Sequence, residues 1–213
     1  MIDRPGDDDF EQLLTRAAAL RGHLCLGLPL GIKMARKGLR LVGMEDPAHR
    51  DDLVVFVENS RCAVDAIQVA TGCSMGSRRL KVYEYGKSAA TFYDRAAGRA
   101  VRVFARPELA SEAVKLAVED GILKRGEEVD LPSKLGKKTM MNALMKLSED
   151  EIFDQQEVIL REAAAFGRGV SARRSPCSAC GEDILDGRGV SRDGMYVCVA
   201  CAGEAYYRLA PRG

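Results

Sequence analysis

Four of the seven cysteines form two pairs near the end of the chain, Cys177-x2-Cys180 and Cys198-x2-Cys201, with 17 residues between the pairs. Two thiolates two residues apart can turn toward one ion, and a second pair returned by a hairpin completes the tetrahedral sulfur shell that zinc accepts. Disulfides within so short a spacing are rare outside redox proteins and secreted scaffolds. The four cysteines therefore predict a structural zinc site.

The other three cysteines, Cys25, Cys62 and Cys73, lie far upstream among apolar and glycine-rich segments. His23 and Cys25 are one residue apart in a glycine-bounded turn, so an extended backbone would direct an imidazole and a thiolate to one side. This pair could bind a metal ion or supply a nucleophile. A small buried cysteine beside a core histidine explains the same residues, and for Cys73 a structural role is the more frequent one.

Cys62 is the strongest single candidate for a reactive or metal-binding group. It begins a segment of helical spacing directly after the β-branched run 53–57, which predicts a buried strand. Asp65 follows at the third position, on the same side of the first helical turn. The positive end of the helix dipole favours a thiolate there.

The pattern of elements predicts an α+β fold, with a mixed or antiparallel sheet flanked by helices. Helices are expected at 7–21, at 28–42 before Gly43, at 62–71 before Gly72, and at 107–123; strands are expected at 53–57, 79–83, 91–93 and 100–104, the last two as a hairpin. Ser148-x-x-Glu151 has the form of a capping box and predicts a second long helix to about residue 166. Asp193-Gly194 predicts a hairpin, and residues 202–209 a short helix.

These elements suggest a core domain at 1–166, a linker at 167–175 and a zinc-ribbon-like module at 176–213. A module of this size cannot bury enough apolar surface to fold alone. We expect it to depend on its metal, whose binding is worth on the order of 10 kcal/mol.

Composition excludes several classes of function. The chain is 46% hydrophobic and 30% charged, as globular proteins are, and 32 basic against 31 acidic side chains give a net charge of +1. This balance offers no general attraction to nucleic acid or to an anionic membrane surface. The acidic start lacks an apolar signal segment, and no run of eighteen apolar residues occurs, so we expect a cytoplasmic protein without a membrane partner.

Five motifs occur in an order that resembles a known family. They are GHLCLG (22–27), CAVDAIQ (62–68), TGC (71–73), YGK (85–87) and TFY (91–93). Together they resemble the FmdE family, which is named after one of the subunits of formylmethanofuran dehydrogenase, over roughly residues 10–165. The four-cysteine tail resembles the zinc-finger extension that some members carry.

The resemblance implies an α+β core, often dimeric, with a metal or active site around the His-x-Cys turn and the Cys-x2-Asp helix start. It also implies a link, through gene context, to molybdenum- or tungsten-dependent formylmethanofuran metabolism. The family usually has His-Gly-His-x-Cys-Pro-Gly, whereas this chain has Arg21 in place of the first histidine and Leu26 in place of the proline. Arginine does not coordinate metals, so either Arg21 holds an anionic ligand or the core site is altered or inactive.

Two hypotheses follow. In the first, His23, Cys25 and Cys62 bind zinc or another transition metal near a dimer interface, Asp65 orients a ligand or acts as general base, and Lys87 and Arg21 hold an anionic one-carbon substrate or cofactor. The protein would then be a metal-dependent formyl-group enzyme, or an accessory component of a molybdenum or tungsten enzyme.

In the second hypothesis the tail is a non-catalytic zinc-ribbon module that binds nucleic acid or a partner protein. Four arginines near the cysteines could contact phosphates: Arg168, Arg173, Arg174 and Arg188. Aromatic residues are sparse among them, so docking on the core or on a partner protein is the favoured role for this module.

Overall fold

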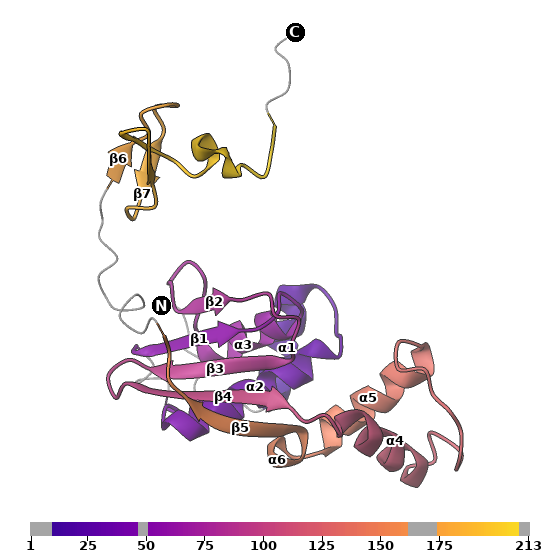
Figure 1. The fold of residues 1–213 in the computed structure, drawn as a ribbon. Coiled ribbons are helices and arrows are strands. Elements are labelled where there is room, and N and C mark those ends of the chain that lie inside the picture. Colours follow the sequence, from indigo (N-terminus) through magenta and orange to yellow (C-terminus); the bar gives the residue numbers. More distant parts are fainter. Residues whose placement is uncertain (1–9, 47–50, 162–173, 209–213) are drawn as a thin grey trace. The chain divides into compact units, whose positions relative to one another are not determined.

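The computed structural model describes residues 10–46, 51–161 and 174–208 of the 213-residue chain. The chain divides into two compact units, Met1–Arg161 and Glu162–Gly213. The first contains the large sheet and its helices, and the second contains the small hairpins that carry the four cysteines (Figure 1). Most of the predicted linker lies outside the described residues, so the predicted domain limits stay predictions.

Five strands form one mixed sheet in the order β2-β1-β3-β4-β5 (Figure 1). Their bounds are β1 Leu53–Val57, β2 Leu80–Val82, β3 Ala89–Asp94, β4 Arg99–Ala105 and β5 Phe153–Val158. β1 is parallel to β2, and the other neighbours are antiparallel. The predicted α+β class, the buried strand β1 and the β3–β4 hairpin are therefore confirmed.

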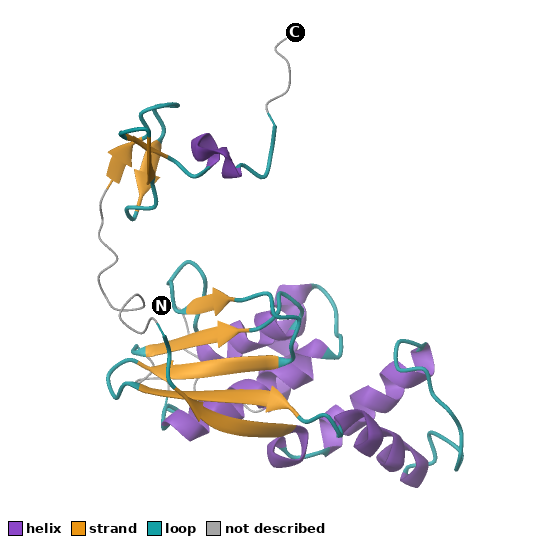
Figure 2. Cartoon of the chain, in the orientation of Figure 1, coloured by secondary structure: helices purple, strands orange, loops and turns teal. Residues whose placement is uncertain are grey.

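Helices α1 (Phe10–Arg21), α2 (Gly27–Val42) and α3 (Ala63–Thr71) cover one face of this sheet (Figure 2). Gly43 and Gly72 end α2 and α3 with φ of 72° and 71°, as their positions predicted. Residues 7–9 of the predicted first helix lie outside the described residues. Because α3 joins β1 to a parallel neighbour, Cys62 is placed at the carboxyl end of β1.

Glycines let α2 pack unusually close to its neighbours. A Cβ on Gly31 would lie 2.5 Å from the carbonyl oxygen of Ala63 in α3, and one on Gly38 would lie 2.2 Å from the Phe92 ring in β3. Phe92 is fully buried. The middle of the core therefore depends on the absence of side chains on α2.

A helical hairpin, α4 (Leu109–Glu119) and α5 (Lys134–Lys146), follows β4. The α4 helix was predicted, but the segment that forms α5 was read only as basic and punctuated by glycine. Its start is fixed by Ser133, whose hydroxyl accepts a hydrogen bond from the backbone of Gly136 at 3.0 Å.

The predicted long helix from Ser148 to residue 166 is wrong. The capping box is present, because Ser148 and Glu151 exchange side-chain and backbone hydrogen bonds, but α6 spans only Glu149–Ile152. The chain then becomes strand β5, which pairs with β4 from Phe153 onward. Pairing with the available edge of β4 and burial of Phe153 outweigh the local helical signal.

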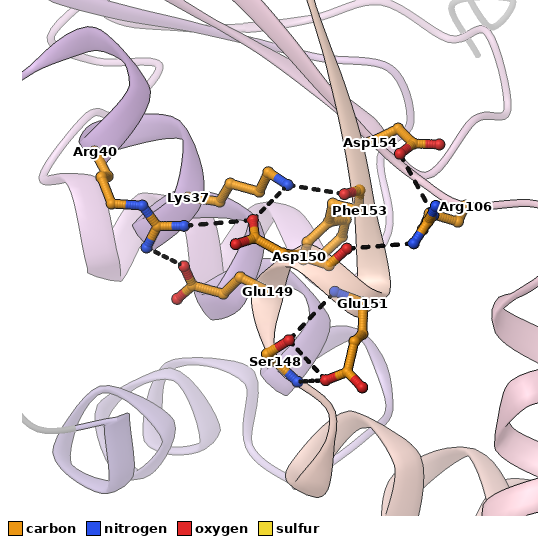
Figure 3. A network of polar contacts seen from close by, with 9 residues as sticks. All are labelled: Lys37, Arg40, Arg106, Ser148, Glu149, Asp150, Glu151, Phe153 and Asp154. Atoms are coloured by element: carbon orange, nitrogen blue, oxygen red, sulfur yellow. Dashed lines mark hydrogen bonds and ion pairs between the residues drawn. The ribbon is translucent and has the colours of Figure 1, made fainter.

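Charged side chains join α2 to α6 (Figure 3). Lys37 is 2% exposed, and its Nζ donates to Oδ1 of Asp150 at 2.9 Å and to the carbonyl of Phe153 at 2.8 Å. Arg40 pairs with Glu149 at 2.6 Å. The acidic first turn of α6 is thus held by the basic side of α2.

The second unit consists of two short hairpins. β6 (Arg174–Pro176) pairs with β7 (Asp183–Leu185), and β8 (Val190–Arg192) pairs with β9 (Met195–Val197). Asp193 and Gly194 turn β8 into β9 with φ of 51° and 76°, which confirms the predicted hairpin. The predicted helix at 202–209 is wrong over 205–208, because the helical turn is Ala200–Glu204 and contains Gly203 at φ 103°; residue 209 lies outside the described residues.

Within the ranges that the structure describes, no helix combines the length and the apolar character needed to cross a bilayer.

Candidate metal sites

The four cysteines of the second unit converge on one point. Their Sγ atoms all lie within 4.8 Å of one another. Cys177 and Cys180 flank the turn between β6 and β7, and Cys198 and Cys201 lie at the end of β9 and in the following helical turn. Zinc–sulfur bonds of about 2.3 Å would separate tetrahedral ligands by roughly 3.8 Å, so a small contraction would complete the shell.

Backbone amides favour negative charge on part of this cluster. The N–H of Cys198 donates to Sγ of Cys177 at 3.3 Å, and the N–H of Cys201 donates to Sγ of Cys198 at 3.4 Å. The amide of Cys180, followed by that of Cys198, lowers the pKa of Cys177 to about 6. The Cys198 side chain, followed by that of Cys180, raises the pKa of Cys201 to about 12. Sulfurs this close resist joint ionisation unless a cation lies between them, so the donor set fits a metal such as zinc.

In the first unit, the structure brings Cys25 and Cys62 together. Cys25 precedes α2, Cys62 occupies the N-cap of α3, and both thiols are free and half-buried. Burial, followed by a hydrogen bond with the Cys62 thiol, raises the pKa of Cys25. A Cβ on Gly27 would lie 2.8 Å from Cβ of Cys62, so the turn before α2 rests directly on the start of α3.

Two charged residues from the sequence prediction also meet here. Nε of Arg21, the last residue of α1, lies 3.8 Å from Oδ2 of Asp65 in the first turn of α3. Both side chains keep contact with solvent, at 42% and 35% exposure. Arg21 therefore has a partner already, and Asp65 is held beside Cys62 as an ion-paired carboxylate.

His23 is exposed in the same turn as Cys25. Among the residues that the structure describes, the four tail cysteines are the only set of three or more histidine, cysteine, aspartate or glutamate side chains with converging ligand atoms. The structure thus assembles two of the three expected core ligands, and the three-ligand site stays a prediction.

Lys87 belongs to a loop tied to the carboxyl end of β1. Its N–H donates to the carbonyl of Glu58 at 3.2 Å, and its own carbonyl accepts from the side chain of Asn59. Asn59 also caps the turn before Cys62 by accepting from the backbone of Arg61 at 3.0 Å. Sequence reasoning missed Asn59, although a polar residue just after a buried strand is a usable signal.

Cys73 has a structural environment. It is 0% exposed, and its Sγ donates to the carbonyl of Leu53 at 3.6 Å. It lies after the end of α3 and within the apolar core, which agrees with the role expected for it.

Residues 20–154 match the model of a family described as FmdE, molybdenum formylmethanofuran dehydrogenase operon. That match covers more than half of the chain and includes Cys25, Cys62 and Lys87. The chain belongs to the FmdE family.

Two known proteins show how far the similarity extends. This FmdE-family chain is 30% identical over 212 residues to an Archaeoglobus fulgidus protein named probable S-adenosyl-L-methionine-binding protein; the match covers 95% of the chain but only 55% of the relative. Its fold also resembles the crystal structure of an FmdE-like protein of tungsten formylmethanofuran dehydrogenase from Syntrophus aciditrophicus. The TM-score is 0.65 at 20% identity, and 95% and 96% of the two chains are covered.

Proposed function

We propose that this FmdE-family protein is a metal-binding protein with two sites of different kinds. The four tail cysteines hold a structural zinc ion. A second transition metal ion binds in the first unit through Cys25 and Cys62, with His23 as the third ligand. The observation that carries this proposal is the contact between the Cys25 and Cys62 thiols, which two separate helix starts bring together.

Two thiolates and an imidazole leave one coordination position open on zinc, and an ion so bound polarises a carbonyl or activates a water molecule. Asp65 lies on the same helical turn as Cys62 and is oriented by Arg21. It is suited to hold a proton or to orient a ligand of the ion. Arg21 and Lys87 provide positive charge for an anionic one-carbon substrate or cofactor. This chemistry suits a formyl-group enzyme or an accessory component in molybdenum- or tungsten-dependent formylmethanofuran metabolism, as a homodimer or with partner subunits.

Metal counting tests the two-site proposal. Purified protein should contain two ions per chain, and the double variant Cys177→Ser, Cys180→Ser should contain one. Adding Cys25→Ser and Cys62→Ser to that variant should remove the last ion, whereas Cys73→Ser is the matched control and should not. One ion in the wild type and none in the double variant would refute the core site.

A second candidate function is protein binding by the tail. Leu185, Met195 and Tyr206 are 53%, 51% and 98% exposed on this small unit. Two tail arginines have internal contacts, since Arg174 lies 3.4 Å from Asp183 and Arg192 donates to the carbonyl of Ala202 at 2.6 Å. Arg168 and Arg173 lie outside the described residues. Apolar exposure with engaged arginines favours a protein partner over nucleic acid.

The Archaeoglobus relative suggests a third candidate, binding of S-adenosyl-L-methionine. Because this chain spans about half of that relative, the ligand could belong to the half that is absent here. Isothermal titration of the full chain with S-adenosyl-L-methionine tests this. Saturable heat at one ligand per chain would support the assignment, and no heat at millimolar ligand would exclude it.

A further inference from the structure

The Cys25 and Cys62 thiols have a second chemical capacity besides metal binding. They come from different elements, are in mutual contact and are both free and half-buried. The close approach is built into the backbone, because Gly27 lacks the Cβ that would lie 2.8 Å from Cβ of Cys62. Cys73 differs, since it is fully buried and bonded to Leu53.

We propose that Cys25 and Cys62 form a reversible redox pair, which peroxide or a small-molecule disulfide closes into an intramolecular disulfide bond. The pair uses the same sulfurs as the proposed core metal site, but its oxidation does not require that a metal ever binds. The bound ion and the disulfide exclude each other, because each uses both sulfurs.

The turn that carries Cys25 can make the small movement that bond formation requires. A disulfide needs an S–S distance of about 2.05 Å and a Cα separation of roughly 4.4 to 6.8 Å. Residues 21–24 are exposed, and Gly22, at φ +87°, has nothing within 4 Å of the position a Cβ would take. The turn can therefore shift toward α3 without meeting packed side chains.

With hydrogen peroxide the steps balance as follows. The sulfur of Cys62, at the start of α3, attacks one peroxide oxygen, loses its proton and becomes a sulfenic acid, and the other oxygen leaves as water. The Cys25 sulfur then attacks the Cys62 sulfur and loses its own proton, and the sulfenic oxygen leaves as a second water. Two thiols are oxidised by two electrons, and one peroxide is reduced to two waters. Burial raises the pKa of Cys25, which favours Cys62 as the first nucleophile.

Peptide mapping of the full chain tests this pair. Metal-free protein is treated with limited peroxide, alkylated and digested with trypsin without reductant. We expect a disulfide between peptides 22–33 and 62–78, with fragmentation assigning it to Cys25 and Cys62 and excluding Cys73. The tail cysteines fall in other tryptic peptides, so oxidation of the tail does not obscure the result.

Variants and metal loading make the test decisive. Cys25→Ser and Cys62→Ser should each abolish the cross-link, and Cys73→Ser should retain it; circular dichroism checks that each variant is folded. With zinc at about ten times its dissociation constant at the core site, the free pair and the oxidation rate should both fall by roughly tenfold. A cross-link that zinc does not slow would support the redox pair and count against the core metal. Oxidation of either cysteine alone, with no cross-link between these peptides, would overturn the inference.

Discussion

The two cysteine sites of this molecule are embedded in opposite ways. In the tail, four sulfurs converge inside a unit whose buried apolar cluster consists only of Cys177, Ile184 and Val197 among the described residues. In the first unit, two sulfurs lie at the margin of a large core that includes fully buried Leu28, Ile32 and Phe92. The comparison teaches that a complete ligand set stands in for a missing core. Where the core is large, the site needs no metal to keep its shape and is free for chemistry.

The largest expected effect breaks the tail alone. Replacing Cys177 and Cys180 by serine removes half of the ligand set, and metal-linked folding energy on the order of 10 kcal/mol is lost with it. Hydrogen exchange should then show unprotected amides at 174–208 and unchanged protection in β1, β3 and β4. Loss of protection in the sheet as well would contradict the independence of the two units.

Packing around α2 should control the first unit. Gly38→Ala places a methyl group 2.2 Å from the Phe92 ring, and overpacking of this kind costs about 1 to 3 kcal/mol. Urea unfolding monitored on the sheet measures the loss. Gly76→Ala is the matched control, because only the hydroxyl of Ser74 lies within 4 Å of its added methyl, and it should change stability by less than about 0.5 kcal/mol.

The contact between α2 and α6 should make the first unit sensitive to acid. The hydrogen bond from Lys37 lowers the pKa of Asp150, so this bond contributes stability above the unfolded carboxyl value of about 3.9, and the contribution is lost as pH falls toward the lower folded value. Lys37→Met removes both bonds made by Nζ, at a cost of about 1 to 3 kcal/mol near pH 7.

Urea unfolding at pH 7 and pH 3 measures this difference. The gap between wild type and Lys37→Met should narrow at the lower pH. Lys115→Met, which breaks the exposed pair with Glu112, should have little effect at either value. An equal gap at both values would contradict the role given to Asp150.

The smallest change in stability accompanies the sharpest test of the core site. Arg21→His restores the histidine usual in the family at the cost of an exposed ion pair with Asp65, worth at most about 1 kcal/mol. An added imidazole should tighten zinc binding at the core by about tenfold, or roughly 1.4 kcal/mol. Competition with a zinc chelator in the Cys177→Ser, Cys180→Ser background measures it. Unchanged affinity would show that position 21 does not face the ion.

Local signals predicted much of this fold. The buried strand Leu53–Val57, the glycines that end α2 and α3, and the Asp193-Gly194 turn depend on neighbours in sequence, and all were predicted. The strand at Phe153–Val158 was missed because it depends on a free edge of β4, which no local pattern reveals.

The candidate sites divide in the same way. Cysteine spacing alone was enough to predict that the tail sulfurs converge, and the helix start at Cys62 was predicted from its position after a strand. The contact of Cys62 with Cys25 and the pairing of Arg21 with Asp65 arise from the packing of α1, α2 and α3. Such contacts between distant elements require the tertiary structure.

The most direct test of the core site is the absorption spectrum of its cobalt(II) form in the Cys177→Ser, Cys180→Ser variant. We expect one cobalt ion per chain, with a thiolate-to-cobalt charge-transfer band whose intensity corresponds to two sulfur ligands. Replacing either Cys25 or Cys62 by serine should reduce that intensity by about half or release the ion. A variant that binds no cobalt, or binds it without a thiolate band, would contradict the claim that these two sulfurs form a metal site.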